Sequence, residues 1–181
     1  GILEMATGSG KTLTAMIAAK HLHEMSRRLL IVIAAPYLPL IDQWCEEVQP
    51  FGVRPVNFTE AANSAARRQL VSKVHRRLRQ GHSDVEVLVA THETLCEPAF
   101  IDAIGAGDAP RLLIADEMHN LGRENFVTNP PEIFEHRLGL SATPVRQYDP
   151  EGTELLTEFF GKVVFRYTLE EAIGTCLVPY D

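Results

Sequence analysis

The sequence has few cysteines, and their arrangement argues against two kinds of site. Three cysteines occur among 181 residues, at Cys45, Cys96 and Cys176, and no Cys-x-x-Cys pair is present. A disulfide framework usually has an even number of cysteines, and a zinc site usually has closely paired ligands. The seven histidines form no ligand pattern either. We therefore predict reduced, buried thiols and no zinc site.

Long apolar runs, secretory signals and internal repeats are also missing from the sequence. No apolar stretch approaches the ~20 residues of a membrane-spanning helix, and no basic segment followed by an apolar run marks a signal peptide. The composition, 45% hydrophobic and 23% charged, is that of an ordinary globular protein. We therefore expect a cytoplasmic protein with one well-buried domain, because 181 residues are few for two.

Acidic side chains are absent from one stretch of a chain that is acidic as a whole. The formal net charge is −7, yet residues 61–83 contain no Asp or Glu and six basic residues: Arg67, Arg68, Lys73, Arg76, Arg77 and Arg79. The other 11 basic and 24 acidic residues leave −13 elsewhere. Apolar spacing predicts a helix over Ala61–Gln80 with its arginines outward. A solvated face is the common explanation of such a run, and a phosphate- or partner-contacting surface is the alternative.

A glycine-rich stretch, Met5–Thr12 (MATGSGKT), lies between an apolar run and a helix-forming run. Strand, glycine turn and helix in this order predict a phosphate-binding loop. Gly8 and Gly10 permit backbone geometry that turns successive N–H groups toward phosphate oxygens. Lys11 reaches the β- and γ-phosphates, and the Thr12 hydroxyl is suited to Mg²⁺. A chance glycine turn before a helix is the alternative, and Met5 departs from the usual small residue.

Strands and helices alternate along the rest of the chain, which predicts an α/β fold with a mostly parallel sheet flanked by helices. The expected strands are Gly1–Met5, Leu29–Ala35, Val53–Phe58, Val85–Ala90, Arg111–Ala115, Arg137–Leu140 and Val163–Tyr167. The expected helices are Leu13–Met25, Leu40–Val48, Ala61–Gln80, Pro98–Ile104, Thr153–Phe160 and Leu169–Ile173. Ligands of such sheets gather at the carboxyl ends of the strands. We therefore expect the phosphate loop, Pro36, Thr91, Asp116 and Ser141 to lie along one edge.

Two adjacent acids, Asp116 and Glu117, follow a buried strand. In a chain with a phosphate loop, such an aspartate usually holds Mg²⁺, here through water, and the neighbouring glutamate polarises the attacking water. The alternative is that both acids cap the next helix. His119 could be a hydrogen-bonding relay or a polar residue at a helix start, and Ser141 and Thr143 could be plain turn hydroxyls.

A buried tryptophan is also expected. Trp44 lies on the apolar stripe of its predicted helix, so we predict a core residue rather than a base-stacking one.

The motifs ATGSGKT (residues 6–12), DEMH (116–119) and SAT (141–143), in this order, resemble those of the first RecA-like motor domain of superfamily 2 helicases of the DExH type. The resemblance covers essentially the whole chain and implies a RecA-like P-loop NTPase fold. The finer resemblance is to the helicase parts of type I and type III restriction enzymes and their relatives in DNA repair. It rests on MATGSGKT, LIDQW (40–44), RLGLSATP (137–144) and the tail over residues 160–180.

The resemblance implies a role for each matching residue. The ATP phosphates would be bound by the phosphate loop, that is by Thr7, Gly8, Ser9, Gly10, Lys11 and Thr12. Thr12 and Asp116 would hold Mg²⁺, partly through water, and Lys11, Asp116 and Glu117 would be catalytic. His119, Ser141 and Thr143 would couple the nucleotide state to movement. Pro36 and Thr91 match stretches that contact the nucleic-acid backbone.

The resemblance also implies partners and missing parts. We expect nucleic acid, DNA rather than RNA, as a partner, together with a second RecA-like domain and an attached nuclease or specificity subunit. The segment that recognises adenine would precede Gly1, and the second motor domain with its arginine would follow Asp181. The 181 residues would thus be a single-domain fragment that hydrolyses ATP hardly at all. The alternatives are a nucleotide-dependent binding or scaffolding module without motor activity and an ATPase unrelated to nucleic acid.

Overall fold

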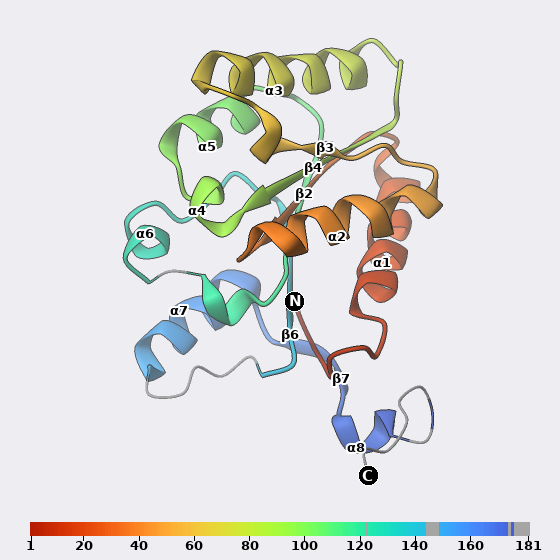
Figure 1. Cartoon of the computed structure of the whole chain (residues 1–181), viewed down its shortest axis with the longest axis vertical. Helices are drawn as coiled ribbons and strands as arrows, with labels where there is room; N and C mark the ends of the chain where they lie inside the picture. The colour runs from red at the N-terminus through yellow and green to blue at the C-terminus, as the bar shows by residue number, and fades with distance from the viewer. Residues whose placement is uncertain (122, 144–148, 174, 176–181) are drawn as a thin grey trace.

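A single parallel sheet forms the centre of the computed structural model, which describes residues 1–121, 123–143, 149–173 and 175. Seven strands pair in the order β3-β4-β2-β5-β6-β1-β7, and every neighbouring pair is parallel (Figure 1). The strands are β1 Ile2–Met5, β2 Leu29–Ala35, β3 Val56–Asn57, β4 Val85–Thr91, β5 Arg111–Ala115, β6 His136–Ser141 and β7 Val163–Tyr167. The predicted α/β class is confirmed.

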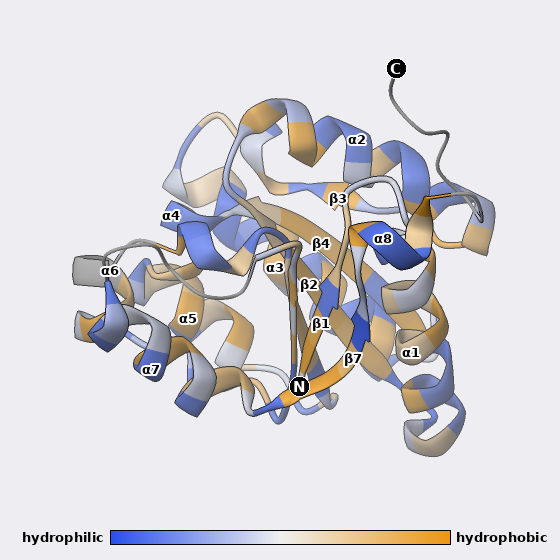
Figure 2. Ribbon diagram, turned by 90° about the horizontal axis from the view of Figure 1, so that it is seen from below, coloured by the Kyte–Doolittle hydropathy of each residue, from blue (hydrophilic) through white to orange (hydrophobic). Residues whose placement is uncertain are grey.

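Helices cover both faces of this sheet. They are α1 Lys11–Ser26, α2 Leu38–Val48, α3 Ser64–Arg79, α4 His92–Leu95, α5 Pro98–Gly105, α6 Arg123–Thr128, α7 Pro150–Phe160 and α8 Leu169–Ala172. Short 3₁₀ turns occur at η1 Gln49–Phe51, η2 Phe58–Glu60 and η3 Met118–Asn120. One buried cluster joins the sheet to α1 and α2, and the other joins it to α3, α4, α5, α6 and α7. The molecule therefore has three layers, with the apolar strands inside (Figure 2).

Strand β2 shows why a continuous apolar run was a good signal for a central strand. Leu30, Val32 and Ala34 belong to one core cluster, and the residues between them belong to the other. Successive side chains of a strand point to opposite faces, so a strand covered on both sides has no polar position.

Local capping explains where the observed elements differ from the predicted ones. The strand predicted over Val53–Phe58 is reduced to β3, because the Asn57 side chain accepts a hydrogen bond from Thr59 N and starts a 3₁₀ turn. Helix α3 begins three residues later than predicted, because Asn63 Oδ1 caps it through Ala66 N. The single turn α4 was not predicted.

Cys45 and Cys96 are free thiols, but only Cys96 is buried. The expectation of buried thiols therefore fails for Cys45, which is half-buried on α2. Cys176, Pro144 and the end of the tail over residues 160–180 lie outside the described residues. None of the described helices is both long and apolar enough to cross a bilayer.

Candidate functional site

The phosphate loop connects the end of β1 to the start of α1. Gly8 and Gly10 have φ angles of 78° and 90°, in the left-handed region that favours glycine. Hydrogen bonds hold the loop, since Ser9 Oγ donates to Ala6 O (2.6 Å) and Ala6 N donates to Tyr167 O (3.1 Å). Helix α1 has no side-chain cap and no acid in its first turn. Its first amides are therefore left uncapped by side chains, and phosphate binding by them stays a prediction.

Lys11 contacts Glu117 across the sheet edge. Its Nζ lies 3.1 Å from Glu117 Oε1, and the two side chains are 11% and 24% exposed. Glu117 has φ 44°, and it is one of only two non-glycine residues with positive φ in the described part of the chain. Such backbone geometry is unfavourable for most residues and concentrates at functional sites. The structure thus brings together two of the predicted catalytic residues, which lie 106 positions apart.

Asp116 follows β5, and its carboxylate is fixed at both oxygens. Oδ2 accepts a hydrogen bond from Trp44 Nε1 (2.9 Å), and Oδ1 accepts one from Glu117 N (3.0 Å). The backbone amide of Asp116 donates to Ala34 O (2.8 Å). Burial raises the pKa of this carboxyl, which is 8% exposed, and Glu117 adds to that effect, while Trp44 and Lys11 oppose it. The Asp116 carboxylate is therefore held in one orientation, with little freedom to rotate.

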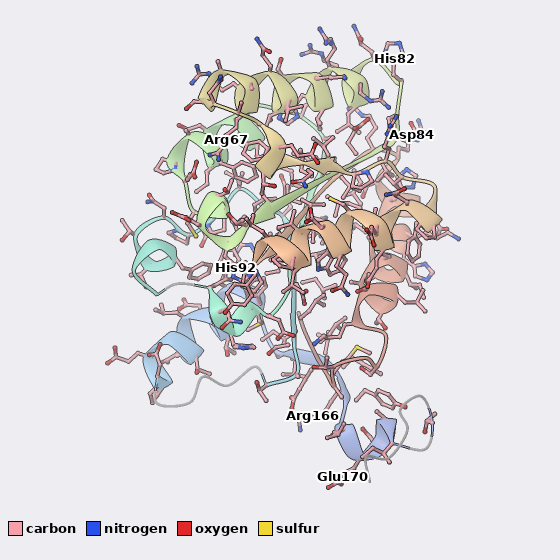
Figure 3. All side chains as sticks on the ribbon, viewed as in Figure 1. Arg67, His82, Asp84, His92, Arg166 and Glu170 are labelled. Carbon is pink, nitrogen blue, oxygen red and sulfur yellow. The ribbon has the colours of Figure 1, made fainter. Side chains whose placement is uncertain are left out.

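Trp44 and His92 are site residues that the sequence analysis did not assign. Trp44 is 3% exposed, which confirms its core position, but its indole N–H also positions Asp116. His92, labelled in Figure 3, is 7% exposed, and its Nε2 lies 2.9 Å from Asp116 O. Burial lowers the pKa of His92 to about 4, so the ring is neutral and Nε2 donates. The one available signal was that a buried indole N–H usually needs an acceptor.

The predicted coupling residues meet between η3 and β6. His119 Nδ1 lies 2.8 Å from Ser141 Oγ and 3.5 Å from Glu117 Oε2. The backbone N–H of Thr143 donates to Ser141 Oγ (3.1 Å). Ser141 is buried, whereas Thr143 is exposed and participates through its backbone. A continuous set of contacts therefore leads from Lys11 through Glu117 to the end of β6.

A hollow of about 460 Å³ lies in front of the phosphate loop. Its lining comes from the loop and α1 (Thr7, Gly8, Gly10, Lys11, Thr12, Leu13), from α2 and η1 (Leu40, Gln43, Glu47, Phe51), and from Asp116 and Glu117. This volume is within the usual range for small-molecule sites. Ser9 does not line the hollow but braces the loop. Helix α2 forms a wall that the sequence analysis did not include.

Pro36 and Thr91 lie at the same sheet edge but do not line this hollow. They follow the paired strands β2 and β4, in which Ala35 is the register partner of Thr91. The Thr91 hydroxyl caps α4, because its Oγ1 accepts from Thr94 N (3.2 Å). Nucleic-acid contact by these two residues stays a prediction.

The oxygen groups at the hollow fit a metal that is shared with a nucleotide. Within the described ranges, no group of three or more His, Cys, Asp or Glu is arranged to hold a metal ion by itself. Mg²⁺ commonly binds through one or two protein oxygens together with substrate phosphates. The fixed Asp116 carboxylate and the Thr12 hydroxyl at the hollow match that donor set.

Comparison with known proteins places the chain in a family. The model of the family described as "Type III restriction enzyme, res subunit" matches residues 1–146. No curated protein sequence gives a significant match.

Similar folds occur in solved structures. The Hef helicase domain of Pyrococcus furiosus has a TM-score of 0.64 at 21% identity, over 92% of this chain and 34% of that one. A nuclease-deletion mutant of the type ISP restriction-modification enzyme LlaGI, in complex with a DNA substrate mimic, has a TM-score of 0.66 at 19% identity. The match covers 95% of this chain and 18% of that one. The Sulfolobus solfataricus SWI2/SNF2 ATPase core in complex with dsDNA has a TM-score of 0.54 at 18% identity, and the match covers 88% of this chain and 31% of that one.

The chain spans about a third or less of each of these structures, and at these identities the likeness shows the fold alone. The family match covers most of the chain and includes the phosphate loop, Asp116–His119 and Ser141–Thr143. The chain therefore belongs to the family described as "Type III restriction enzyme, res subunit", and its fold is that of RecA-like helicase domains.

Proposed function

We propose that this chain is the ATP-binding motor domain of a cytoplasmic, DNA-dependent ATPase that translocates on or unwinds duplex DNA. The observation that carries the proposal is the Lys11–Glu117 contact of 3.1 Å beside the doubly held Asp116 carboxylate. A lysine, a metal-binding acid and a water-activating acid are the groups that phosphoryl transfer from ATP requires.

Phosphate binding would begin with the loop over Thr7–Thr12. The uncapped amides of α1 and the backbone of the loop would surround the phosphates, and Lys11 would move from Glu117 to their oxygens. Lys11 would exchange one anionic partner for another, so its charge would stay paired when the contact with Glu117 is released. The release would leave the Glu117 carboxylate free to accept a proton from the attacking water.

The metal site would be completed by Thr12 and Asp116, partly through water. When bound, Mg²⁺ would neutralise charge that develops on the transferred phosphoryl group. Trp44 and the Glu117 amide would keep the Asp116 carboxylate facing the hollow. Through the contacts of His119, Ser141 and Thr143, a movement of Glu117 would shift the end of β6.

Duplex DNA is the proposed polymer, with Pro36 and Thr91 as contacts at the carboxyl edge of the sheet. Support comes from the restriction-enzyme family and from the DNA in two of the similar structures. Backbone contacts of this kind carry no sequence information, which suits a motor that tracks along DNA.

The proposed motor also needs a second RecA-like domain, and we expect a nuclease or specificity subunit as a further partner. In related enzymes an arginine from outside the phosphate loop accelerates transfer by ~10³–10⁵. We therefore expect these 181 residues to bind Mg²⁺–ATP and to hydrolyse it slowly.

The test compares wild type with Lys11→Ala in calorimetric titrations with ATP and Mg²⁺. Lys20→Ala is the matched control, because Lys20 also lies on α1 but is exposed and pairs with Glu24 on the same helix. We expect Lys11→Ala alone to weaken binding, and equal binding by both variants would refute the nucleotide site. In the full-length protein, duplex DNA should stimulate hydrolysis. A turnover that DNA leaves unchanged would favour a scaffolding module instead.

A further inference from the structure

Helix α3 presents a basic outward face whose charges the fold does not use. We define the basic face by four exposed side chains without an ion pair or hydrogen bond in the described part of the chain: Arg68, Lys73, Arg76 and Arg79. The other two cations of the helix are occupied. Arg67, labelled in Figure 3, pairs with Glu97 (3.3 Å), and Arg77 pairs with the buried Glu86.

The direction of this face is fixed by the core. Val71, Val74 and Leu78 are buried on the opposite side of α3, so the helix cannot rotate without exposing them. Figure 3 shows a row of nitrogen-tipped side chains along α3 that point away from the sheet. Arg68, Ser72 and Arg76 follow at intervals of four residues and line a surface hollow of about 620 Å³. The four cations of the basic face therefore project from the side of α3 that lies opposite its buried residues.

Unpaired like charges at this spacing are unfavourable in the free protein. Lys73, Arg76 and Arg79 follow one another at intervals of three residues, so like charges are neighbours on the helix surface and repel one another. No acid lies nearby in sequence to offset them, although the chain as a whole carries −7. Such an arrangement favours a polyanion as partner.

The length of the face matches a short stretch of DNA backbone. Arg68 and Arg76 lie eight residues apart, which corresponds to about 12 Å along a helix. One strand of B-DNA carries a phosphate for every ~3.4 Å of its axis, so about three phosphates fit within that length.

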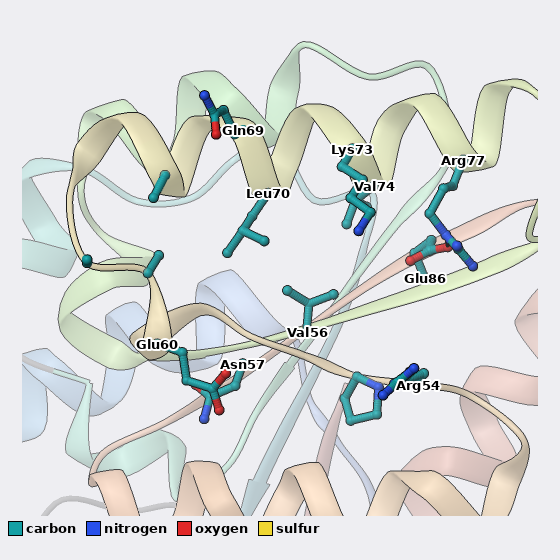
Figure 4. Close-up of a pocket in the computed structure, with 14 residues that line it drawn as sticks. Arg54, Val56, Asn57, Glu60, Gln69, Leu70, Lys73, Val74, Arg77 and Glu86 are labelled. Atoms are coloured by element: carbon teal, nitrogen blue, oxygen red, sulfur yellow. Dashed lines mark hydrogen bonds and ion pairs between the residues drawn. The ribbon is translucent and has the colours of Figure 1, made fainter.

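The neighbouring groove suits a polyanion less well. A hollow of about 690 Å³ lies between β3 and α3 (Figure 4). Its cations are Arg54, Arg77 and Lys73, which lies at the border with the basic face and lines both hollows, but Glu60 and Glu86 line the groove as well. The acids offset most of the positive charge there, whereas none of the described residues that line the hollow on the basic face is acidic.

The start of α3 lies close to the sheet edge at which Thr91 is found. Arg67, in the first turn of α3, pairs with Glu97 at the α4–α5 junction, and α4 is capped by Thr91. We infer that the basic face of α3 is an additional docking surface for the phosphate backbone of duplex DNA, continuous with the edge at Pro36 and Thr91. The inference rests on the proposed function, because it concerns the same duplex.

The experiment measures binding of a fluorescein-labelled 30-base-pair duplex between 50 and 200 mM salt, without nucleotide. The test variant is Arg68→Gln with Arg76→Gln, and the matched control is Lys20→Gln with Lys162→Gln, two exposed cations outside α3. The slope of log K against log salt is negative, and each lost phosphate contact makes it shallower by about 0.9. We expect the slope of the test variant to be shallower than that of wild type by about two and the slope of the control to be unchanged.

Several results would overturn the inference. They are an unchanged salt slope in the test variant, a failure of wild type to bind the duplex at 50 mM salt, and a shallower slope for Arg54→Gln but not for the test variant. Loss of binding to phosphatidylserine vesicles with DNA binding intact would assign the face to a membrane. Calorimetry with ATP and Mg²⁺ on the same proteins separates the two proposals. If wild type binds nucleotide but the test variant has an unchanged salt slope, only the docking surface is rejected.

Discussion

Replacing Trp44 by Phe tests whether the indole positions the proposed metal ligand. The substitution keeps an aromatic ring in the core but removes the only side-chain N–H that reaches Asp116 Oδ2 among the described residues, at 2.9 Å. Both partners are nearly inaccessible, at 3% and 8% exposure. A phenyl ring offers no donor in place of the indole N–H, so Oδ2 loses this hydrogen bond on the side that faces the core.

The expected magnitude follows from the charge and burial of the pair. A hydrogen bond to a charged group contributes about 1.5–3 kcal/mol. The bond favours the ionised carboxylate, so its loss raises the pKa of Asp116 further above its ordinary value. The raised pKa means that the buried charge costs stability at neutral pH and that this cost disappears as pH falls through the folded-state pKa. Trp44→Phe should therefore destabilise more at pH 7 than in acid.

The assay is a double-mutant cycle with Asp116→Ala, followed by urea unfolding and circular dichroism. The smaller ring costs the same stability whether Trp44→Phe is made in wild type or in Asp116→Ala. The coupling energy of the cycle therefore isolates the hydrogen bond. We expect a coupling of about 1.5–3 kcal/mol at pH 7. A coupling below about 0.5 kcal/mol, the usual limit of additivity, would refute the reasoning. Because Trp44 is the only tryptophan, its emission in wild type should also change when Mg²⁺–ATP binds.

Three further predictions concern neighbouring positions. Burial lowers the pKa of His92 from about 6.5 to about 4, so as pH drops His92 is protonated in the unfolded chain before it is protonated in the folded one. The free energy of unfolding should therefore fall between these pH values, by up to about 3 kcal/mol. Unfolding curves of His92→Asn should show a smaller pH dependence. Gly139→Ala should cost about 1–3 kcal/mol of unfolding free energy, because a Cβ there would lie 2.3 Å from Met118 Sδ. Burial raises the pKa of Cys96 to about 11, so iodoacetamide at pH 8 should label it slowly in the native state and readily in urea.

Much of the fold could be predicted because its signals are local. The all-apolar β2 indicated a strand covered on both sides, and α3 showed its apolar stripe and basic face directly. Boundaries were less accurate, since side-chain caps such as Asn57 and Asn63 decided them. Cys45 was expected to be buried and is not fully so, because its position on α2 lies at the margin of the apolar stripe.

The sequence by itself determined the parallel α/β architecture, the phosphate loop and the order of its motifs, because these depend on residue types at short spacings. Only the tertiary structure decided which side chains meet. The Lys11–Glu117 and Trp44–Asp116 contacts join residues 106 and 72 positions apart. Their geometry depends on the stacking order of the strands and on the packing of α2 against the sheet, which local patterns do not encode.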